Sequence, residues 1–284
     1  MTTTSPPKAC VIGWPVKHSR SPLIHGYWLK KHGIAGSYEK REVRADELPD
    51  FINAIRRGDY VGCNVTIPHK ENIARLVDEV DPAAAKAGSL NTVYIEKDRL
   101  KATSTDGHGF LANLLSCHPG YSISKKPIVI LGAGGSARAI ANTLAQHNAI
   151  EILINNRTHS RAENIAEVIG SPLRAINHQQ LNNALPEAGL IINTTSAGLT
   201  DSEQINLPWS ILDPQTIIAD IVYTPLITPL LSAAKNHGHP IVPGLGMLLH
   251  QAVFGFEKWF GLRPQVTREL YDIVARDIDP GYSS

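Results

Sequence analysis

The segment from Ile128 to Arg138, Ile-Val-Ile-Leu-Gly-Ala-Gly-Gly-Ser-Ala-Arg, constrains the fold of this chain more than any other. Its first four residues are apolar and mostly β-branched, which is typical of a strand buried on both faces of a parallel sheet. Glycines break the strand, and residues 136–145 then place apolar side chains at helical spacing. The Gly-x-Gly-x-x-Ala pattern suits a tight turn that brings backbone N–H groups and a helix N-terminus to a pyrophosphate. An ordinary tight turn would use the same glycines, so the pattern alone does not decide between the two.

The end of the next predicted strand favours NADP over NAD. An NAD site usually has Asp or Glu about 20 residues after the glycines, where the carboxylate holds the ribose hydroxyls. Residues 151–155 are instead followed by Asn156, Arg157 and Thr158, with Arg161 one turn later. A carboxylate would repel a ribose phosphate, whereas guanidinium groups bind one through paired donors. The alternative is that both arginines are simply solvated at the start of a helix.

Composition excludes several classes of protein. The 284 residues suffice for one large or two ordinary domains. A hydrophobic content of 43%, a charged content of 19% and a net charge of +1 fit a soluble globular protein, with no charge excess that would indicate nucleic acid or an anionic membrane. Three widely separated cysteines argue against a disulfide framework and for a reducing compartment. Because the sequence has no apolar signal core and no run as long as a membrane span, we expect a cytoplasmic protein.

Strands and helices alternate along the whole chain, which predicts an α/β protein of two domains. From Pro127 onward the order is that of a doubly wound, Rossmann-like domain, which we place at residues 106–243. Residues 1–105 predict an α/β substrate domain, and the last helices, within residues 244–284, are expected to return to it, with a cleft between the domains. The other strands are expected at residues 9–12, 38–43, 61–65, 92–95, 100–103, 190–193, 217–220 and 241–242.

Two ionisable residues outside the nucleotide domain's glycine loop are candidates for proton transfer. Lys70 follows a buried strand, at the end where α/β sheets present their ligands, and we expect it in the first turn of a helix that starts at Pro68. The helix dipole alone would lower the pKa of Lys70 by well under one unit. Lys70 is therefore either a solvated lysine or a proton donor or acceptor beside a substrate carbonyl. Asp106 is either a helix cap or the carboxylate that holds the Lys70 ammonium in a proton-relay pair.

Several uncharged polar residues could bind a substrate. Ser21 is expected to cap a helix over residues 22–31, whereas the sequence gives Ser19 no such role, and hydroxyls at a helix N-terminus can bind a carboxylate. Asn91, Tyr223 and Gln251 lie near turns or in apolar helical patterns, and each alone is more often structural. The sequence has twelve histidines but no His-Glu-x-x-His, so we expect no metal site.

Nine sequence blocks, in order from one end of the chain to the other, carry a family resemblance: residues 13–22, 64–70, 91–92, 105–107, 132–138, 156–158, 193–198, 220–225 and 244–251. Together they resemble the shikimate dehydrogenase family. The resemblance implies NADPH-dependent, reversible reduction of 3-dehydroshikimate to shikimate in aromatic amino-acid and chorismate biosynthesis. It also implies that Lys70 and Asp106 are the catalytic acid–base pair.

The resemblance further implies roles for the binding residues. Ser19 and Ser21 would hold the substrate carboxylate. Thr66, Asn91 and Gln251 would bind its ring hydroxyls, and Tyr223 would lie near substrate and nicotinamide. The residues implied for NADP are Gly132, Ala133, Gly134, Gly135, Ser136, Ala137, Asn156, Arg157, Thr158, Arg161, Thr195, Gly244 and Met247, the last bordering the nicotinamide. The sequence departs from the family pattern just before Asp106: it has Ser104 where the family often has Asn, and Ala102 where Gly is common. These two positions bear on how the loop that carries Asp106 is supported, and not on Asp106 itself.

Two alternatives to this function remain. One is a quinate/shikimate dehydrogenase that uses NAD; the pair Ser19 and Ser21, and Arg157 in place of an acid, speak against it. The other is a non-enzymatic NADP-binding regulator, which would be expected to lack Lys70 or Asp106, and both are present. We expect a monomer or homodimer with a small-molecule substrate and no nucleic-acid or membrane partner.

Overall fold

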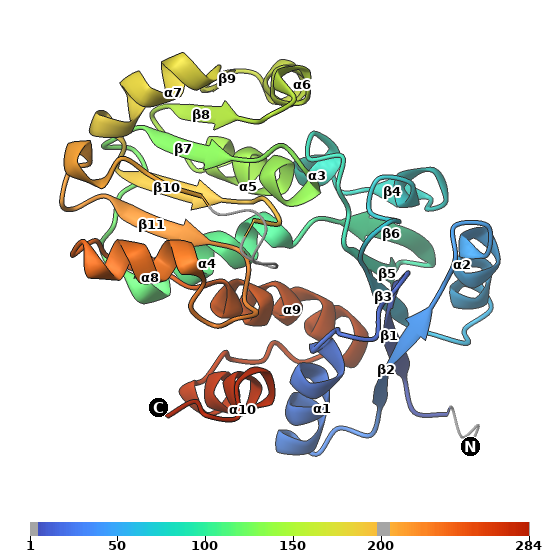
Figure 1. The fold of residues 1–284 in the computed structure, drawn as a ribbon. Helices are drawn as coiled ribbons and strands as arrows, with labels where there is room; N and C mark the ends of the chain where they lie inside the picture. Colours follow the sequence, from blue (N-terminus) through green and yellow to red (C-terminus); the bar gives the residue numbers. More distant parts are fainter. Residues whose placement is uncertain (1–4, 198–204, 284) are drawn as a thin grey trace. The chain divides into compact units, whose positions relative to one another are not determined.

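The structure, a computed structural model, describes residues 5–197 and 205–283, and the chain forms two compact units (Figure 1). The first unit comprises residues 1–105 and 251–274, and the second comprises residues 106–250 and 275–284. Each unit is built on a six-stranded sheet covered by helices. The predicted two-domain α/β fold is therefore confirmed, while the assignment of residues 244–284 to the substrate domain stays a prediction.

The sheet of the first unit is mixed, with strand order β2-β1-β3-β5-β6-β4. One half of the sheet is parallel: its central strand, β1, pairs with β2 on one side and with β3 on the other. The antiparallel half contains the hairpin of β5 and β6, two strands that the sequence predicts. The strands are β1 (Lys8–Gly13), β2 (Ser37–Glu42), β3 (Gly62–Val65), β4 (Glu79–Val80), β5 (Thr92–Glu96) and β6 (Arg99–Thr103).

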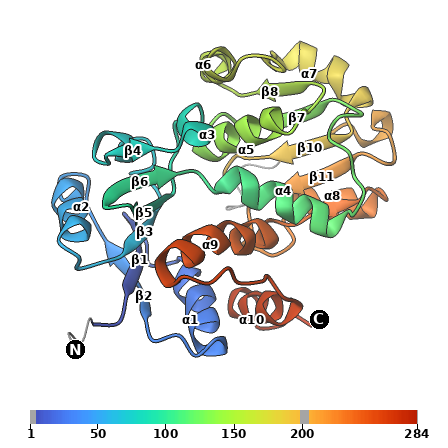
Figure 2. The same cartoon turned by 180° about the vertical axis from the view of Figure 1, so that it is seen from behind.

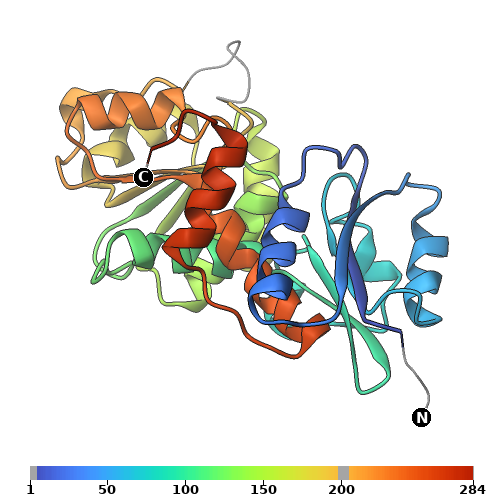
Figure 3. The same cartoon turned by 90° about the horizontal axis from the view of Figure 1, so that it is seen from below.

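Helices cover both faces of this sheet. On one face, α2 (Leu48–Arg56) buries four apolar side chains spaced as one helix stripe against alternate residues of β1 and β3. On the other face lie α1 (Ser21–Lys31) and the last turns of α9 (Gly244–Phe260), seen in Figure 3 in blue and in orange-red. These two helices contact each other through the rings of Trp28 and Phe256. The short helices are α3 (Pro82–Ala85) and the 3-10 helix η1 (Ile73–Arg75).

The sheet of the second unit is entirely parallel, with strand order β12-β11-β10-β7-β8-β9. The first strand of the unit, β7, lies in the middle, and the chain winds outward from it in both directions, which is the doubly wound arrangement predicted from the sequence. The strands are β7 (Ile128–Leu131), β8 (Ile152–Asn155), β9 (Leu173–Ala175), β10 (Leu190–Asn193), β11 (Ile217–Asp220) and β12 (Ile241–Val242).

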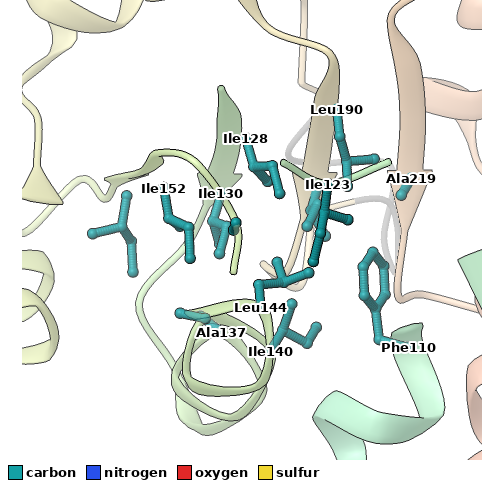
Figure 4. Close-up of a cluster of buried hydrophobic side chains, with 14 of the residues drawn as sticks. Phe110, Ile123, Ile128, Ile130, Ala137, Ile140, Leu144, Ile152, Leu190 and Ala219 are labelled. Carbon is teal, nitrogen blue, oxygen red and sulfur yellow. The ribbon is translucent and has the colours of Figure 1, made fainter. Parts of the chain in front are cut away.

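The core of the second unit consists of two apolar layers, one on each face of its sheet. Ile128 and Ile130 of β7 point to the face covered by α4 (Asp106–Cys117), α5 (Gly135–Gln146) and α6 (His159–Ile169), as Figures 2 and 4 show. Val129 and Leu131 point to the opposite face, under α7 (His178–Ala184) and α8 (Pro229–Asn236). Both faces of β7 are buried, as its unbroken apolar run predicted.

The remaining helical segments are α10 (Arg268–Ile278) and the 3-10 helices η2 (Leu185–Glu187) and η3 (Trp209–Ile211). Within residues 5–197 and 205–283, none of the helices combines the length and the hydrophobicity that a membrane span needs.

Candidate active site

The glycine loop of the second unit has the geometry of a phosphate cradle. Gly132 has a φ of +106°, and a Cβ there would lie 2.7 Å from Thr194 Oγ1 and 2.9 Å from Thr195 Cγ2. Only glycine fits this backbone at this distance. Gly134 faces open space and caps α5 without any side-chain hydrogen bond to the first turn. The first turn of α5 therefore keeps backbone donors for an anion, which fits the diphosphate of a dinucleotide.

The end of β8 carries cationic and amide side chains and no carboxylate, as the sequence predicted. Arg157 and Arg161 are both exposed at the start of α6, whose cap residue Thr158 makes no capping hydrogen bond. The Asn156 amide donates to the Thr158 carbonyl at 2.9 Å and so fixes the turn between them. An exposed pair of guanidinium groups beside an uncapped helix N-terminus fits a phosphate on the ribose.

Two further loops, after β10 and β11, are tied together by a buried carboxylate that sequence reasoning did not single out. Asp220, at the end of β11, accepts hydrogen bonds from Asn193 Nδ2 at 3.0 Å, Thr228 Oγ1 at 2.7 Å and Val222 N at 3.0 Å. Burial raises the pKa of Asp220 above its usual range, and these hydrogen bonds oppose the shift. The only sequence signal was a carboxylate that ends a buried apolar strand.

The same network positions Thr195, an expected cofactor residue. Thr195 N and Oγ1 donate to Asn193 Oδ1 at 2.9 and 2.7 Å, so the loop after β10 folds back on its own strand. Tyr223, half-buried, follows Asp220 by three residues in the loop after β11. Gly198, the last residue of the block that contains Thr195, lies outside the described residues.

Gly244 and Met247 begin α9 in the second unit. A Cβ at Gly244 would lie 2.5 Å from the Ile221 carbonyl oxygen, so the helix starts in close backbone contact with the loop after β11. Met247 is buried in the core cluster of the sheet. Their roles toward a nucleotide stay predictions.

In the first unit, neither of the two serines at the start of α1 caps the helix, whose cap residue is Arg20. Ser21 is the first residue of the helix and makes no capping hydrogen bond, so the expectation that it is the cap is wrong. Ser19 Oγ instead accepts the N–H of Ser21 at 3.3 Å and lies 3.2 Å from Ser21 Oγ. The turn before α1, closed by Ser19 N and the Val16 carbonyl, brings Ser19 beside Ser21, the first residue of the helix. The two hydroxyls are adjacent and can hold one carboxylate together.

Lys70 does not lie in a helix, which corrects the sequence expectation. Residues 67–72 form turns, closed by His69 N to Thr66 O at 2.9 Å and Asn72 N to His69 O at 3.0 Å, before η1 begins. His69 is fully buried, and its Nε2 lies 2.7 Å from the Val43 carbonyl oxygen. Packing of this side chain overrides the local helical preference. Lys70 is half-buried and its carbonyl accepts the N–H of Leu90, so its backbone is fixed beside β5.

Asn91 and Gln251, two expected substrate residues, lie together in the first unit. Asn91 Nδ2 donates to Thr105 Oγ1 at 2.9 Å and to Gln251 Oε1 at 3.4 Å. Asn91 Oδ1 accepts the N–H of Thr105 at 2.8 Å, which fixes the chain immediately before Asp106. This bond supports the loop next to Ser104, the residue that departs from the family pattern. The Ser104 hydroxyl itself is buried and makes no hydrogen bond among the described residues.

Lys70 belongs to the first unit. Asp106 is the first residue of the second unit and also the first residue of α4. Asp106 is 6% exposed. Each residue is described within its own unit, so their action as a pair stays a prediction. Among the residues that the structure describes, no group of three or more His, Cys, Asp or Glu side chains could hold a metal ion.

Three family models match the chain. They are described as the shikimate dehydrogenase substrate binding domain, over residues 11–93, shikimate/quinate 5-dehydrogenase, over residues 116–221, and the shikimate 5'-dehydrogenase C-terminal domain, over residues 244–268.

Known proteins similar to this chain cover nearly all of it. The shikimate dehydrogenase (NADP(+)) of Rhizobium meliloti is 47% identical over 273 residues, 95% of each chain. Shikimate 5-dehydrogenase of Listeria monocytogenes, solved with shikimate and NAD, has a TM-score of 0.88 at 33% identity and covers 96% of this chain and 97% of that one. The Thermus thermophilus enzyme, solved with NADP(H) and shikimate, has a TM-score of 0.84 at 36% identity, with 96% and 99% covered.

Proposed function

Because this chain belongs to the shikimate dehydrogenase family, we propose that it catalyses the NADPH-dependent, reversible reduction of 3-dehydroshikimate to shikimate. This places it in aromatic amino-acid and chorismate biosynthesis. The observation that carries the proposal is near-complete coverage at 47% identity by a relative named as NADP(+)-dependent. The positively charged end of β8 supports the same cofactor from the chain's own residues.

For the substrate, the proposal assigns each polar cluster of the first unit a task. The adjacent hydroxyls of Ser19 and Ser21 bind the carboxylate at the start of α1. Thr66, Asn91 and Gln251 bind ring hydroxyls; Asn91 and Gln251 already share a hydrogen bond. Lys70 and Asp106 hold and move the proton that the substrate oxygen gains on reduction, and Tyr223 lies near the substrate and the nicotinamide.

For the cofactor, the proposal uses the loops of the second unit. Bound NADPH supplies the hydride. The backbone of the Gly132 loop binds its diphosphate and the cationic end of β8 binds its ribose phosphate. Met247 borders the nicotinamide, and Thr195 and Gly244 are further cofactor-binding residues. The full set of cofactor residues is Gly132, Ala133, Gly134, Gly135, Ser136, Ala137, Asn156, Arg157, Thr158, Arg161, Thr195, Gly244 and Met247.

We also infer that the protein works in a reducing cytoplasm on a small molecule, as a monomer or homodimer and without a nucleic-acid or membrane partner. The three cysteines are free, and Cys117 is exposed, as is usual where thiols stay reduced. The net charge of +1 offers no excess for a polyanion.

The test is to follow NADPH absorbance with 3-dehydroshikimate and, in reverse, to compare shikimate and quinate with NADP and NAD. We expect the highest kcat/KM with shikimate and NADP. Faster turnover of quinate with NAD would favour the quinate/shikimate dehydrogenase instead. NADP binding without turnover of either acid would favour the non-enzymatic regulator.

A further inference from the structure

A half-buried tyrosine and a buried asparagine, to which the proposed function gives no role, are joined by a short hydrogen bond. The Tyr38 hydroxyl donates to Asn64 Oδ1 at 2.6 Å. Tyr38 lies on β2 and Asn64 on β3, and β1 runs between these two strands. The register places Tyr38 beside Ala9 and Asn64 beside Val11, so the tyrosine reaches diagonally over β1 on one face of the sheet. The methyl side chain of Ala9 leaves room for this reach.

The ring of Tyr38 is held in one orientation by an aromatic cluster. His25 of α1 stacks on it with ring centroids 3.9 Å apart and planes at 8°. Trp259 of α9 lies against both rings, at 5.5 Å from His25 and 5.8 Å from Tyr38. His25 is fully buried, and neither of its ring nitrogens lies within hydrogen-bonding distance and angle of a partner among the described residues. The imidazole of His25 therefore stacks on the Tyr38 ring and restricts its orientation, which in turn fixes the direction of the Tyr38 hydroxyl.

From Asn64 the hydrogen bonds lead to the predicted substrate residues. Asn64 Nδ2 donates to the Asn91 carbonyl and to Thr92 Oγ1, both at 3.2 Å. Asn91 in turn donates through its side chain to Gln251. Asn64 is only 5% exposed, so its amide has no solvent alternative for these partners. The Tyr38 hydroxyl thus fixes which way the Asn64 amide points, and Asn64 fixes the backbone that carries the Asn91 side chain.

Ser21 connects to the same hydroxyl. Burial raises the pKa of Tyr38 well above its usual range, and a hydrogen bond with the Ser21 side chain acts in the opposite direction. The Tyr38 phenol therefore interacts with the serine proposed for the carboxylate as well as with the asparagine that leads to the ring-hydroxyl residues.

We propose that Tyr38 is a positioning residue for substrate binding, which acts through Asn64 on Asn91 and Gln251 without being needed for the chemical step. This inference rests on the proposed function, because that function assigns Asn91 and Gln251 to the substrate. Without the hydroxyl, Asn64 Oδ1 becomes a buried acceptor with its strongest partner missing, and the amide is free to turn.

Tyr38→Phe tests the proposal, because it removes the hydroxyl and keeps the stacked ring. Tyr60→Phe is the matched control: Tyr60 is also in the first unit, and its hydroxyl donates to Glu39 Oε1 at 2.8 Å, away from the proposed substrate residues. We expect Tyr38→Phe to raise the calorimetric Kd for shikimate and its KM about tenfold, the scale of one lost buried hydrogen bond. The kcat should fall by less than about threefold, and the Kd for NADP should change less than about twofold.

Tyr60→Phe should leave all of these values within about twofold of wild type. An unchanged shikimate Kd in Tyr38→Phe, or the same loss in Tyr60→Phe, would overturn the inference. If wild type itself binds no shikimate, the proposed function fails, and that result is distinct from wild-type binding that Tyr38→Phe leaves intact.

A double-mutant cycle with Asn64→Ala tests the route. If Tyr38 acts through Asn64, the double variant should bind shikimate no more weakly than Asn64→Ala alone. Losses that add in the double variant would mean that Tyr38 does not act through Asn64. The Tyr38 and Tyr60 variants decide the proposal on their own if Asn64→Ala does not fold.

Discussion

Lys70 is positioned by its backbone. The Leu90 N–H binds its carbonyl at 2.9 Å, and the buried His69 anchors the turn that contains it. Lys70 is half-buried, and it follows β3 by five residues in the same loop as Thr66, another of the proposed substrate residues.

We expect Lys70→Ala to lower kcat at least about a hundredfold, the usual scale for removing a positioned acid–base group. The Kd for NADP should change little, because the nucleotide loops belong to the second unit. Steady-state rates with NADPH and 3-dehydroshikimate, and calorimetry with NADP, measure the two effects. Lys125→Ala, at an exposed lysine before β7, is the control and should keep full activity. A Lys70→Ala enzyme with most of its activity would contradict the proton-transfer role.

The candidate site residues stand out in the sequence more clearly than their local contacts do. Ser19 and Ser21 stand out by sequence because two hydroxyls precede a proline at a helix start. Neither of them caps the helix: a turn closed by Ser19 N and the Val16 carbonyl precedes it and Ser21 is already its first residue, which the local sequence does not encode. The positioning role of Tyr38 had no sequence signal at all, since it depends on pairing across β1.

At the scale of elements, the loop between β7 and α5 combines two constraints at Gly132: a positive φ and a close approach to Thr194 and Thr195. Gly120 offers a matched control in the same unit, because its φ is +88° but a Cβ there would meet nothing within 4 Å. Alanine at either site adds backbone strain. Only alanine at Gly132 also pushes against the loop that carries Thr195.

We therefore expect Gly132→Ala to raise the Kd for NADP at least about tenfold, equivalent to about 1.4 kcal/mol. Gly120→Ala should lose about 1 kcal/mol of stability through its positive φ yet bind NADP as wild type does. Calorimetric titration with NADP, together with urea unfolding of both variants, separates the effects. Equal affinities in the two variants would show that strain alone, and not the approach to Thr195, matters here.

Elements with strong internal patterns were predictable, and those created by tertiary contacts were not. The apolar runs of β7, β10 and β11 identify buried parallel strands without reference to the rest of the chain. β4 has two half-buried residues and β9 has three residues of mixed burial, so neither has a pattern to read, and both exist because a neighbouring strand pairs with them. The segment after Pro68 resembles a helix start but forms turns, because burial of His69 outweighs its local preference.

At the scale of the whole molecule, the chain passes between its two units at residues 105–106, 250–251 and 274–275. The first passage coincides with the start of α4, a boundary that the sequence indicates. The other two fall inside α9 and α10, and a continuous helix carries no sequence signal of a domain boundary. Each unit nevertheless has its own sheet and core, and its stability can be examined through its own buried groups.

His25 links the stability of the first unit to pH. Burial lowers its pKa to about 3 from 6.5, so the folded chain keeps it neutral where the unfolded chain would protonate it. Between these values the unfolded state binds the extra proton, and stability therefore falls as pH drops below 6.5. The slope from this one group is at most about 1.4 kcal/mol per pH unit. Above pH 6.5 both states leave the ring neutral, and His25 contributes no pH dependence.

We expect His25→Phe, which keeps a ring against Tyr38 and removes the titrating group, to lessen the stability lost between about pH 6.5 and about pH 4.5 by about 2–3 kcal/mol. Urea unfolding followed by tryptophan fluorescence measures this, because three of the four tryptophans, Trp14, Trp28 and Trp259, belong to the first unit. His32→Gln, at an exposed histidine just after α1, is the control and should keep the wild-type slope. If His25→Phe and wild type lose stability in parallel over this range, then His25 takes up its proton without unfolding, and its burial does not set the acid limit of this unit.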